Sequence, residues 1–219
     1  MKNKLLKTII LSLFIVNSIT ISFAGELASQ FADKAYISYG NANFTEDEKK
    51  LTDAFETYTQ LDEYGRCGVA FANICKDIMP TEDRGSIGMI KPSGWVTPLS
   101  KYDFIDGKYL YNRCHLIAYE LAGENANEKN LITGTRFLNI KGMRPFETKV
   151  SKYVRETGNH CLYRVTPIFE NDNLLCEGVQ IEAYSVEDNG EGINFNVLCF
   201  NVQPGVNIDY TTGANNSAN

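Results

Sequence analysis

The sequence has few of the side chains that build structural zinc sites. It contains only two histidines, His115 and His160, and its six cysteines include no C-x-x-C pair. A closed zinc site needs four nitrogen or sulfur ligands, usually in closely spaced pairs, so the composition argues against a domain stabilised by structural zinc. The sequence also lacks internal repeats and long low-complexity stretches. These absences indicate an ordinary globular protein, whose function must depend on a localised group of residues.

Long apolar runs are scarce as well. The one long run, Ile9 to Ile21, follows the basic start Met1-Lys2-Asn3-Lys4 and ends at Ser22-Phe23-Ala24. A charged start, a short apolar stretch and a small-x-small site are typical of a secretory signal peptide. The run is shorter than the roughly 20 apolar residues of a membrane span. We therefore expect a signal peptide at 1–24 and a secreted single domain at 25–219; an uncleaved membrane anchor is the alternative.

Basic residues are absent from the last quarter of the chain. Residues 165–219 carry eight acidic groups and no Lys or Arg, and residues 25–83 have a net charge of −7. From Arg84 to Arg164, by contrast, 13 basic and 7 acidic residues give a net charge of +6. A local basic face can bind phosphate on a protein that is acidic overall. Ordinary variation of surface charge is the alternative interpretation.

All six cysteines belong to the part of the chain that would be exported. They are Cys67, Cys75, Cys114, Cys161, Cys176 and Cys199. Exported proteins meet oxidising conditions, so we expect at least one disulfide, although the sequence does not select the pairing. For several of them the alternative is a small buried hydrophobic residue.

The residue pattern predicts an α+β fold. Thr45-Glu46-Asp47-Glu48 resembles a capping box and predicts a helix at 46–59. A second helix should begin at Pro145, present apolar residues at intervals of four and three, and end at Gly158. Strands are predicted at 65–72, 108–118, 161–169, 174–186 and 193–203, with the last three forming an antiparallel meander. An ordered loop with short strands is predicted at 79–98, a loop at 125–130, and a frayed tail at 211–219.

The residues best suited to chemistry are Asn112-Arg113-Cys114-His115, Asn139 and Glu147. Cleavage of a phosphodiester requires that a water lose a proton, that the phosphorane charge be neutralised and that the departing 3′ oxygen be stabilised. A histidine is suited to the first task near neutral pH. Magnesium is suited to the other two, and it accepts few protein ligands of the hard-oxygen kind that Asn139 offers.

These motifs resemble the DNA/RNA non-specific endonucleases with a ββα-metal (His-Me finger) core, in particular the secreted Gram-positive type. The strongest signature of that family is Asp-Arg-Gly-His, and Asn112-Arg113-Cys114-His115 stands in its place. The resemblance covers about residues 60–212. Further matching stretches are Arg84-Gly-Ser-Ile-Gly88, Asn130-Leu-Ile-Thr-Gly-Thr-Arg136, Tyr163-Arg-Val-Thr-Pro-Ile-Phe169 and Val202-Gln-Pro-Gly205.

The resemblance implies a role for each site residue. His115 would be the general base, and Asn139 the one direct protein ligand of Mg²⁺, or of Mn²⁺ in its place. Glu147, eight positions later, would support the water shell of the ion, and Arg113 would position or neutralise phosphate. The further expected substrate contacts are Asn112, Arg136 and Arg144. His160 lacks comparable neighbours in the sequence and is interpreted as structural.

Two positions depart from the family pattern. Asn112 replaces an acid, which weakens any influence of this position on His115. Cys114 replaces a glycine, but neighbouring strand residues point to opposite faces, so Cys114 can pack inward without blocking the site. The same alternation makes Cys114 and His115 poorly placed to act together as a thiol hydrolase.

The sequence therefore predicts a secreted endonuclease that cuts DNA and RNA with one hydrated Mg²⁺. One alternative is a catalytically silent nucleic-acid-binding protein that keeps the basic face. Another is a membrane-anchored nuclease that serves DNA uptake.

Overall fold

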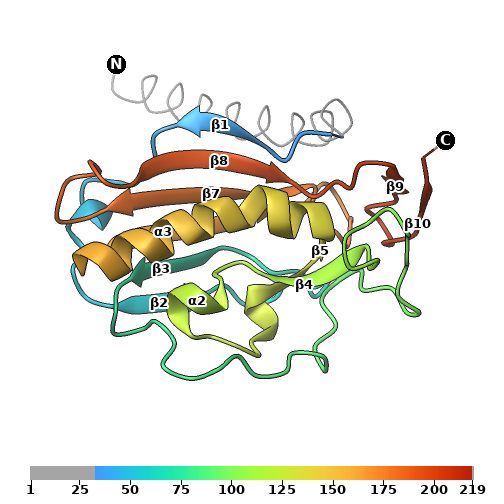
Figure 1. The fold of residues 1–219 in the computed structure, drawn as a ribbon, viewed down its shortest axis with the longest axis horizontal. Helices are drawn as coiled ribbons and strands as arrows, with labels where there is room; N and C mark the ends of the chain where they lie inside the picture. Colours follow the sequence, from blue (N-terminus) through green and yellow to red (C-terminus); the bar gives the residue numbers. More distant parts are fainter. Residues whose placement is uncertain (1–32, 219) are drawn as a thin grey trace, which may run out of the picture.

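The centre of the fold is a six-stranded antiparallel sheet, seen in a computed structural model that describes residues 33–218. The strand order is β1-β8-β7-β6-β3-β2 (Figure 1). The bounds are Tyr36–Gly40 (β1), Phe55–Tyr58 (β2), Ala70–Ile74 (β3), Cys161–Ile168 (β6), Gly178–Ser185 (β7) and Asn194–Phe200 (β8). Within residues 33–218 no helix has the length and apolar character needed to cross a membrane. The expected signal peptide at 1–24 lies outside the described residues.

The meander predicted for the last third of the chain is confirmed. β6 pairs with β7 from Cys161↔Ser185 to Ile168↔Gly178, and β7 pairs with β8 from Gly178↔Phe200 onward. All three strands are buried along most of their length. Their apolar side chains supply much of the main core, which explains why their hydrophobic runs were readable in the sequence.

Helix α3 (Arg144–Thr157) lies across one face of this sheet (Figure 1). Val150 and Val154 are fully buried in the main core, and the ring of Phe146 packs against that of Phe195 on β8 at 5.1 Å between centroids. The helix has a proline in its first turn and ends at Gly158, whose φ of 78° is a left-handed C-cap. This helix is confirmed as predicted.

A smaller two-stranded unit stands beside the sheet and leads into α3. β4 (Tyr111–His115) pairs with β5 (Leu131–Thr135), with His115 opposite Leu131. The chain then runs through η3 (Leu138–Met143), a π-helical segment, directly into α3. The order strand, strand, helix is the ββα arrangement, and the predicted α+β fold class is confirmed. A short helix α2 (Tyr119–Ala122) and a 3₁₀ turn η2 (Glu128–Asn130) occupy the β4–β5 connection.

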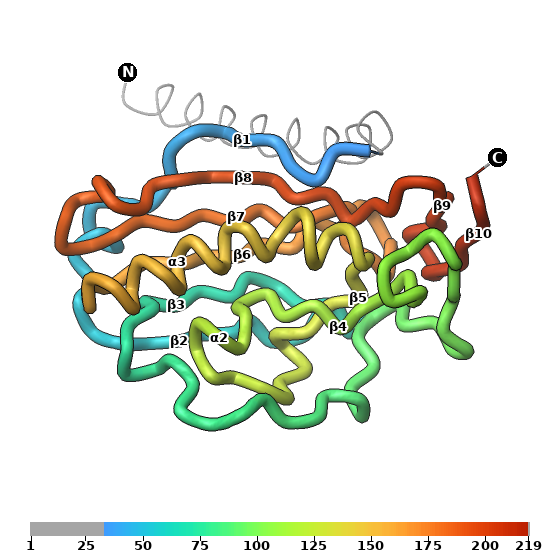
Figure 2. The backbone as a smooth tube through the Cα atoms, viewed as in Figure 1, coloured from blue at the N-terminus to red at the C-terminus, as the bar shows by residue number. Residues whose placement is uncertain are grey.

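The segment between β3 and β4 makes a long excursion around the outside of the fold (Figure 2). It contains no helix or paired strand beyond the isolated bridge Lys101↔Tyr109, so the loop predicted at 79–98 is confirmed and the short strands predicted within it are wrong. Buried Met79 and Ile105 attach it to the body.

The predicted helix at 46–59 is wrong beyond its first turn. The capping box forms, since the Thr45 N–H donates to Glu48 Oε2 (2.7 Å) and the Glu48 N–H donates to Thr45 Oγ1 (3.1 Å). It caps only the 3₁₀ turn η1 (Glu48–Lys50), after which the chain extends and β2 pairs with β3. Phe55 packs edge-on against Phe71 of β3 at 5.0 Å, so tertiary packing overrides the local helix signal.

Two further boundaries differ from the sequence-based expectation. The strand predicted at 65–72 lies at Ala70–Ile74, because its pairing with β6 begins at Ala70↔Val165. The tail is not frayed: β9 (Val206–Ile208) pairs with β10 (Asn215–Ser217). The buried Tyr111 hydroxyl donates to the Gly213 carbonyl at 2.9 Å, which ties this hairpin to β4.

The expected disulfide is wrong for this structure, in which all six cysteines are free and buried. They act as small apolar side chains, and Cys67, Cys114, Cys161, Cys176 and Cys199 belong to the main core. The structure shows how Cys114, which replaces the family glycine, is accommodated. A Cβ on Gly134 of the neighbouring strand would lie 2.5 Å from Cys114 Sγ, so the missing side chain on β5 makes room for the extra one on β4.

Candidate active site

A pocket of about 460 Å³ opens where β4, α2, η3 and the start of α3 meet. It gathers five of the residues singled out in the sequence: Arg113, His115, Asn139, Arg144 and Glu147. Two charged residues that sequence reasoning did not assign, Arg84 and Glu120, also line it. Three arginines and two carboxylates thus surround one buried imidazole and one amide.

His115 is held at the end of β4 by hydrogen bonds to both ring nitrogens. Nε2 lies 2.8 Å from the backbone carbonyl oxygen of Asn125, and Nδ1 lies 3.2 Å from a guanidinium nitrogen of Arg84. A carbonyl oxygen only accepts, so Nε2 carries the proton and Nδ1 keeps its lone pair. The unprotonated nitrogen therefore faces Arg84, which lines the same pocket.

The surroundings of His115 keep its ring neutral. Burial lowers its pKa to about 4, the Asn125 hydrogen bond opposes this shift, and the positive charge of Arg84 adds to it. The imidazole is therefore in its basic form at neutral pH. A neutral histidine with an unprotonated Nδ1 directed toward a polar pocket can accept a proton from a water there.

Asn130 fixes the end of the strand that carries His115. This fully buried side chain accepts a hydrogen bond from the Ile117 N–H (2.9 Å) and donates one to the Ile117 carbonyl (3.0 Å). The Leu116 N–H in turn donates to the Asn130 carbonyl at 2.9 Å. These three bonds join the end of β4 to the start of β5, which explains why an asparagine opens the Asn130–Arg136 stretch.

Asn139 and Glu147 line the pocket from η3 and α3. Glu147 is only 8% exposed, and its carboxylate makes no hydrogen bond or salt bridge with any residue in 33–218. Burial, and next the nearby Glu120 carboxylate, raise its pKa to about 8, against the opposing charges of Arg144 and Arg84. An unpaired buried carboxylate beside an amide and a second carboxylate is an environment that a hydrated divalent cation would stabilise.

Arg113 shares the pocket but is anchored elsewhere. Its Nε donates to the Ile90 carbonyl, its Nη2 donates to the Gly88 carbonyl at 2.9 Å, and its guanidinium lies 4.0 Å from the ring centroid of Trp95. The first role visible for Arg113 is thus to hold the loop that carries Arg84. A planar fork that donates two hydrogen bonds while stacked on an aromatic ring is a property of arginine that lysine lacks.

We expect Arg113→Lys to loosen this loop without unfolding the protein. The variant keeps the charge but loses the fork and the stack on Trp95, so residues 84–95 should be cleaved by trypsin-like proteases about tenfold faster, with an almost unchanged Tm. Limited proteolysis followed by mass spectrometry measures this. Arg155→Lys is the matched control, since Arg155 is an exposed α3 residue bonded only to Ser151. Equal protection of the loop in both variants would contradict the anchoring role.

Asn112 and Arg136, which we expected to contact substrate, are not in this pocket. Arg136 forms a salt bridge with Asp106 at 3.0 Å and contacts Asn112 Oδ1 at 3.5 Å. The alternation of β4 explains this placement, since Asn112 shares the face of Cys114 and not that of Arg113 and His115. The other predicted alternation, with Arg113 and His115 on one face, is borne out by the pocket.

His160 is structural, as predicted. Its Nδ1 lies 2.5 Å from Glu187 Oε1 and its backbone N–H donates to Glu187 Oε2 at 2.8 Å. Arg164, the last residue of the basic segment, also lies outside the site and is paired with Glu48 and Glu182. The basic segment therefore supplies the pocket mainly through Arg84, Arg113 and Arg144.

The chain resembles known nucleases in sequence and in fold. Residues 45–187 match the model of a family described as DNA/RNA non-specific endonuclease. A deoxyribonuclease from Streptococcus dysgalactiae subsp. equisimilis is 26% identical over 207 residues, which cover 76% of this chain and 62% of the relative. The chain thus spans less than two thirds of the length of that relative.

Two solved structures share both fold and detectable sequence similarity. NucA from Streptococcus agalactiae with magnesium ion bound is 25% identical with a TM-score of 0.71, over 82% of this chain and 85% of that one. Sda1 nuclease with bound zinc ion is 27% identical with a TM-score of 0.72, over 87% and 99%. The match to the family model spans more than half of the sequence and includes His115, Asn139 and Glu147. The chain belongs to the DNA/RNA non-specific endonuclease family.

Proposed function

We propose that this chain is a secreted, sugar-non-specific endonuclease that hydrolyses phosphodiester bonds in DNA and RNA with one divalent cation. The observation that carries the proposal is the geometry of His115. Its neutral ring is oriented by the Asn125 carbonyl, and its unprotonated Nδ1 faces a pocket that also holds Asn139, Glu147 and three arginines. This combination supplies a base, an oxygen ligand and a binding site for phosphate.

His115 performs the proton transfer in this mechanism. Nδ1 accepts a proton from water as the water oxygen forms a bond to phosphorus and the bond to the 3′ oxygen breaks. The 3′ oxygen takes up a proton from solvent water and His115 afterwards releases its proton to solvent, so the products are a 5′ phosphate and a 3′ hydroxyl. The hydrogen bond from Nε2 to the Asn125 carbonyl keeps the ring in the required tautomer and becomes stronger when the ring gains charge.

The arginines receive the phosphate. In the free protein Arg84 donates to Nδ1 of His115, which withholds the base from water. A phosphate oxygen is a stronger partner for a guanidinium than a neutral imidazole is, so substrate entry should draw Arg84 away and release Nδ1. Arg144 is exposed and lines the same pocket from the start of α3, and it can neutralise a second phosphate oxygen.

Asn139 would bind the cation directly, with Glu147 and Glu120 acting on its water ligands. A bound cation of this kind supplies Lewis-acid stabilisation of the phosphorane and of the leaving oxygen. The donors present are oxygens, and the one histidine in the pocket has both nitrogens engaged. Such a set favours Mg²⁺ or Mn²⁺ over Zn²⁺, which prefers nitrogen and sulfur. The two solved relatives contain magnesium and zinc respectively.

We expect the purified protein to cut both plasmid DNA and structured RNA when Mg²⁺ or Mn²⁺ is present. EDTA should abolish cleavage, excess Mg²⁺ should restore it, and Zn²⁺ should restore it poorly because its preferred ligands are missing. Gel electrophoresis with end analysis of the products measures both activity and the position of the 5′ phosphate. Binding of nucleic acid without any cleavage would favour the silent binding protein instead.

Secretion is proposed because residues 1–24 have the features of a signal peptide. The N-terminal sequence of protein from the culture medium distinguishes a secreted domain from a membrane-anchored nuclease that takes up DNA.

A further inference from the structure

A second, smaller pocket of about 300 Å³ adjoins the catalytic pocket across a single turn of η3. Ile140 lines both pockets, while its neighbours Asn139 and Lys141 line one each. The second pocket is also lined by Phe104, Arg136 and Phe137. A nucleic-acid strand that ran along η3 with its scissile phosphate in the catalytic pocket would place a neighbouring nucleotide at this second pocket.

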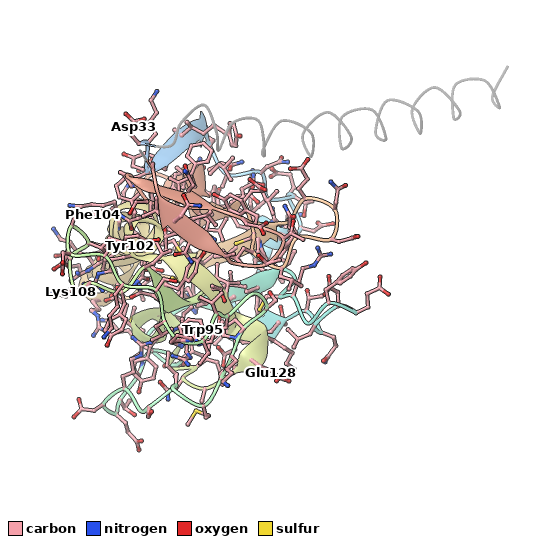
Figure 3. The ribbon with its side chains drawn as sticks, turned by 90° about the vertical axis from the view of Figure 1, so that its right-hand side faces the viewer. Asp33, Trp95, Tyr102, Phe104, Lys108 and Glu128 are labelled. Carbon is pink, nitrogen blue, oxygen red and sulfur yellow. The ribbon has the colours of Figure 1, made fainter. Side chains whose placement is uncertain are left out.

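Phe104 gives the second pocket an exposed aromatic face. It is 59% exposed and lies at the tip of the 101–109 loop, beside Tyr102 and near Lys108 at one edge of the molecule (Figure 3). The ring centroids of Tyr102 and Phe104 are 5.3 Å apart. Neighbouring Ile105 is buried, and the exposed ring of Phe104 lines the second pocket, where it offers a flat apolar face for stacking.

The loop that presents Phe104 is ordered by its own backbone. The Tyr102 N–H donates to the Lys108 carbonyl (2.9 Å), and the Lys108 N–H donates to the Ile105 carbonyl (2.8 Å). The bridge Lys101↔Tyr109 closes the base of the loop. The backbone that carries the ring is therefore ordered, which reduces the entropy lost by the loop when a ligand binds there.

Cations stand beside this ring. Lys141 is exposed and makes no salt bridge with any residue in 33–218. The salt bridge of Arg136 is with Asp106, whose side chain is 85% exposed, and its contact with Asn112 Oδ1 is long at 3.5 Å, so a phosphate could displace these weak partners. One aromatic face with cations at its edge matches a single nucleotide, which has a flat base and a phosphate.

We propose that Phe104, Arg136 and Lys141 form a stacking subsite for one unpaired nucleotide of the substrate strand. In a duplex the face of each base is covered by its neighbours, and exposing it costs free energy of unstacking. The subsite therefore selects single-stranded stretches, frayed ends and locally melted duplex. This inference rests on the proposed nuclease function and extends it to the form of the substrate.

The test uses the full mature protein and a fluorescent single strand of about 12 nucleotides, a length typical of single-strand binding sites. Anisotropy is measured in EDTA, so that no cleavage occurs, for wild type, Phe104→Ala, Phe104→Trp and the control Tyr39→Ala. Tyr39 is an aromatic residue on the edge strand β1 and is 53% exposed. The same strand is also tested annealed to its complement and with abasic sites throughout.

We expect Phe104→Ala to weaken binding of the single strand by about tenfold, the effect of losing one stacked base. Phe104→Trp and Tyr39→Ala should stay within about twofold of wild type. Phe104→Ala should change binding of the duplex and of the abasic strand by less than about twofold. Unchanged single-strand binding by Phe104→Ala, or an equal loss on the duplex and the abasic strand, would overturn the subsite.

A small nitrophenyl phosphodiester, which cannot reach the second pocket, separates this inference from the proposed function. With Mg²⁺, Phe104→Ala should lose about tenfold more kcat/KM on the single strand than on this ester, and an equal loss on both substrates would show that Phe104 supports the catalytic pocket instead. If wild type cleaves neither this ester nor plasmid DNA, the proposed nuclease function fails, whatever the stacking result.

Discussion

Replacing His115 with Ala should lower kcat by about 10²–10⁴-fold, the usual effect of removing a general base. Binding of DNA should remain close to wild type, because the arginines of the pocket are retained. Initial rates on plasmid DNA at saturating Mg²⁺ measure the first effect, and anisotropy in EDTA measures the second. His160→Ala is the matched control, since the other histidine of the chain pairs with Glu187 outside the site. Wild-type turnover by His115→Ala would remove the assignment.

The pH profile of the wild type gives a second check on the same residue. Burial lowers the pKa of His115 to about 4, below its usual value near 6.5. A base with a lowered pKa loses its bound proton at lower pH, so kcat/KM, which reports the free enzyme, should rise through about pH 4 and be level by pH 6.5. An acid limb centred near pH 6.5 would show that His115 is solvated in the working enzyme.

Replacing Asn139 with Ala should reduce cleavage by about 10³-fold or more, because several kcal/mol of charge stabilisation depend on the cation. Asn139 is the one amide side chain that lines the pocket. Calorimetric titration with Mg²⁺ should show weak binding by wild type and none by the variant, since the substrate phosphate completes the site. Glu147→Ala should be impaired but measurably active, because it acts through water.

Asn207→Ala is a suitable control for the Asn139 variant. Asn207 is an exposed residue of β9 that bonds to Asn216, so its loss should leave cleavage and Mg²⁺ titration unchanged. Tight binding of Mg²⁺ that survives Asn139→Ala would place the ion elsewhere in the protein.

The fold was readable from the sequence where side chains alternate or follow a helical period. The strands β6, β7 and β8 and the helix α3 carry long apolar patterns between clear turn residues, and all four were predicted. β5 was missed because its run Leu131–Thr135 is short and contains Gly134, and a glycine inside a strand pattern weakens the strand signal. The first helix was wrong beyond one turn because pairing of β2 with β3 was decided by residues distant in sequence.

The sequence identified only those site residues that belong to the recognised motifs. His115, Asn139 and Glu147 have a recognisable spacing, and the structure brings them together. Arg84 reaches His115 from 31 positions away, through a loop with no periodic pattern. The Asn125 carbonyl belongs to the backbone, so no side-chain pattern could reveal that it orients the imidazole. Distant loops and backbone groups are therefore what the sequence could not supply.

The wide turn of η3 has a consequence for the angular positions of Asn139 and Glu147. Each residue of a regular α-helix turns the chain by about 100°, so eight residues would leave these two side chains about 80° apart around the axis. In a π-helical segment each hydrogen bond spans one more residue. The extra residue in the π-helical turn therefore adds little net rotation about the helix axis. The eight residues rotate the chain about as far as seven regular ones, about 700°, which is within about 20° of two full turns.

The eight-residue spacing thus belongs to a helix with one inserted residue. Gly142 lets this widened turn lie close to the sheet, because a Cβ there would be 3.2 Å from Cβ of Cys199 on β8. Deleting a single residue from η3 would leave seven regular steps, so Asn139 and Glu147 would still point in nearly the same direction. Regular α-helical winding of all eight residues would instead turn Asn139 by about 80° relative to Glu147, so at this spacing it is the π-helical turn that makes the amide and the carboxylate face the same pocket.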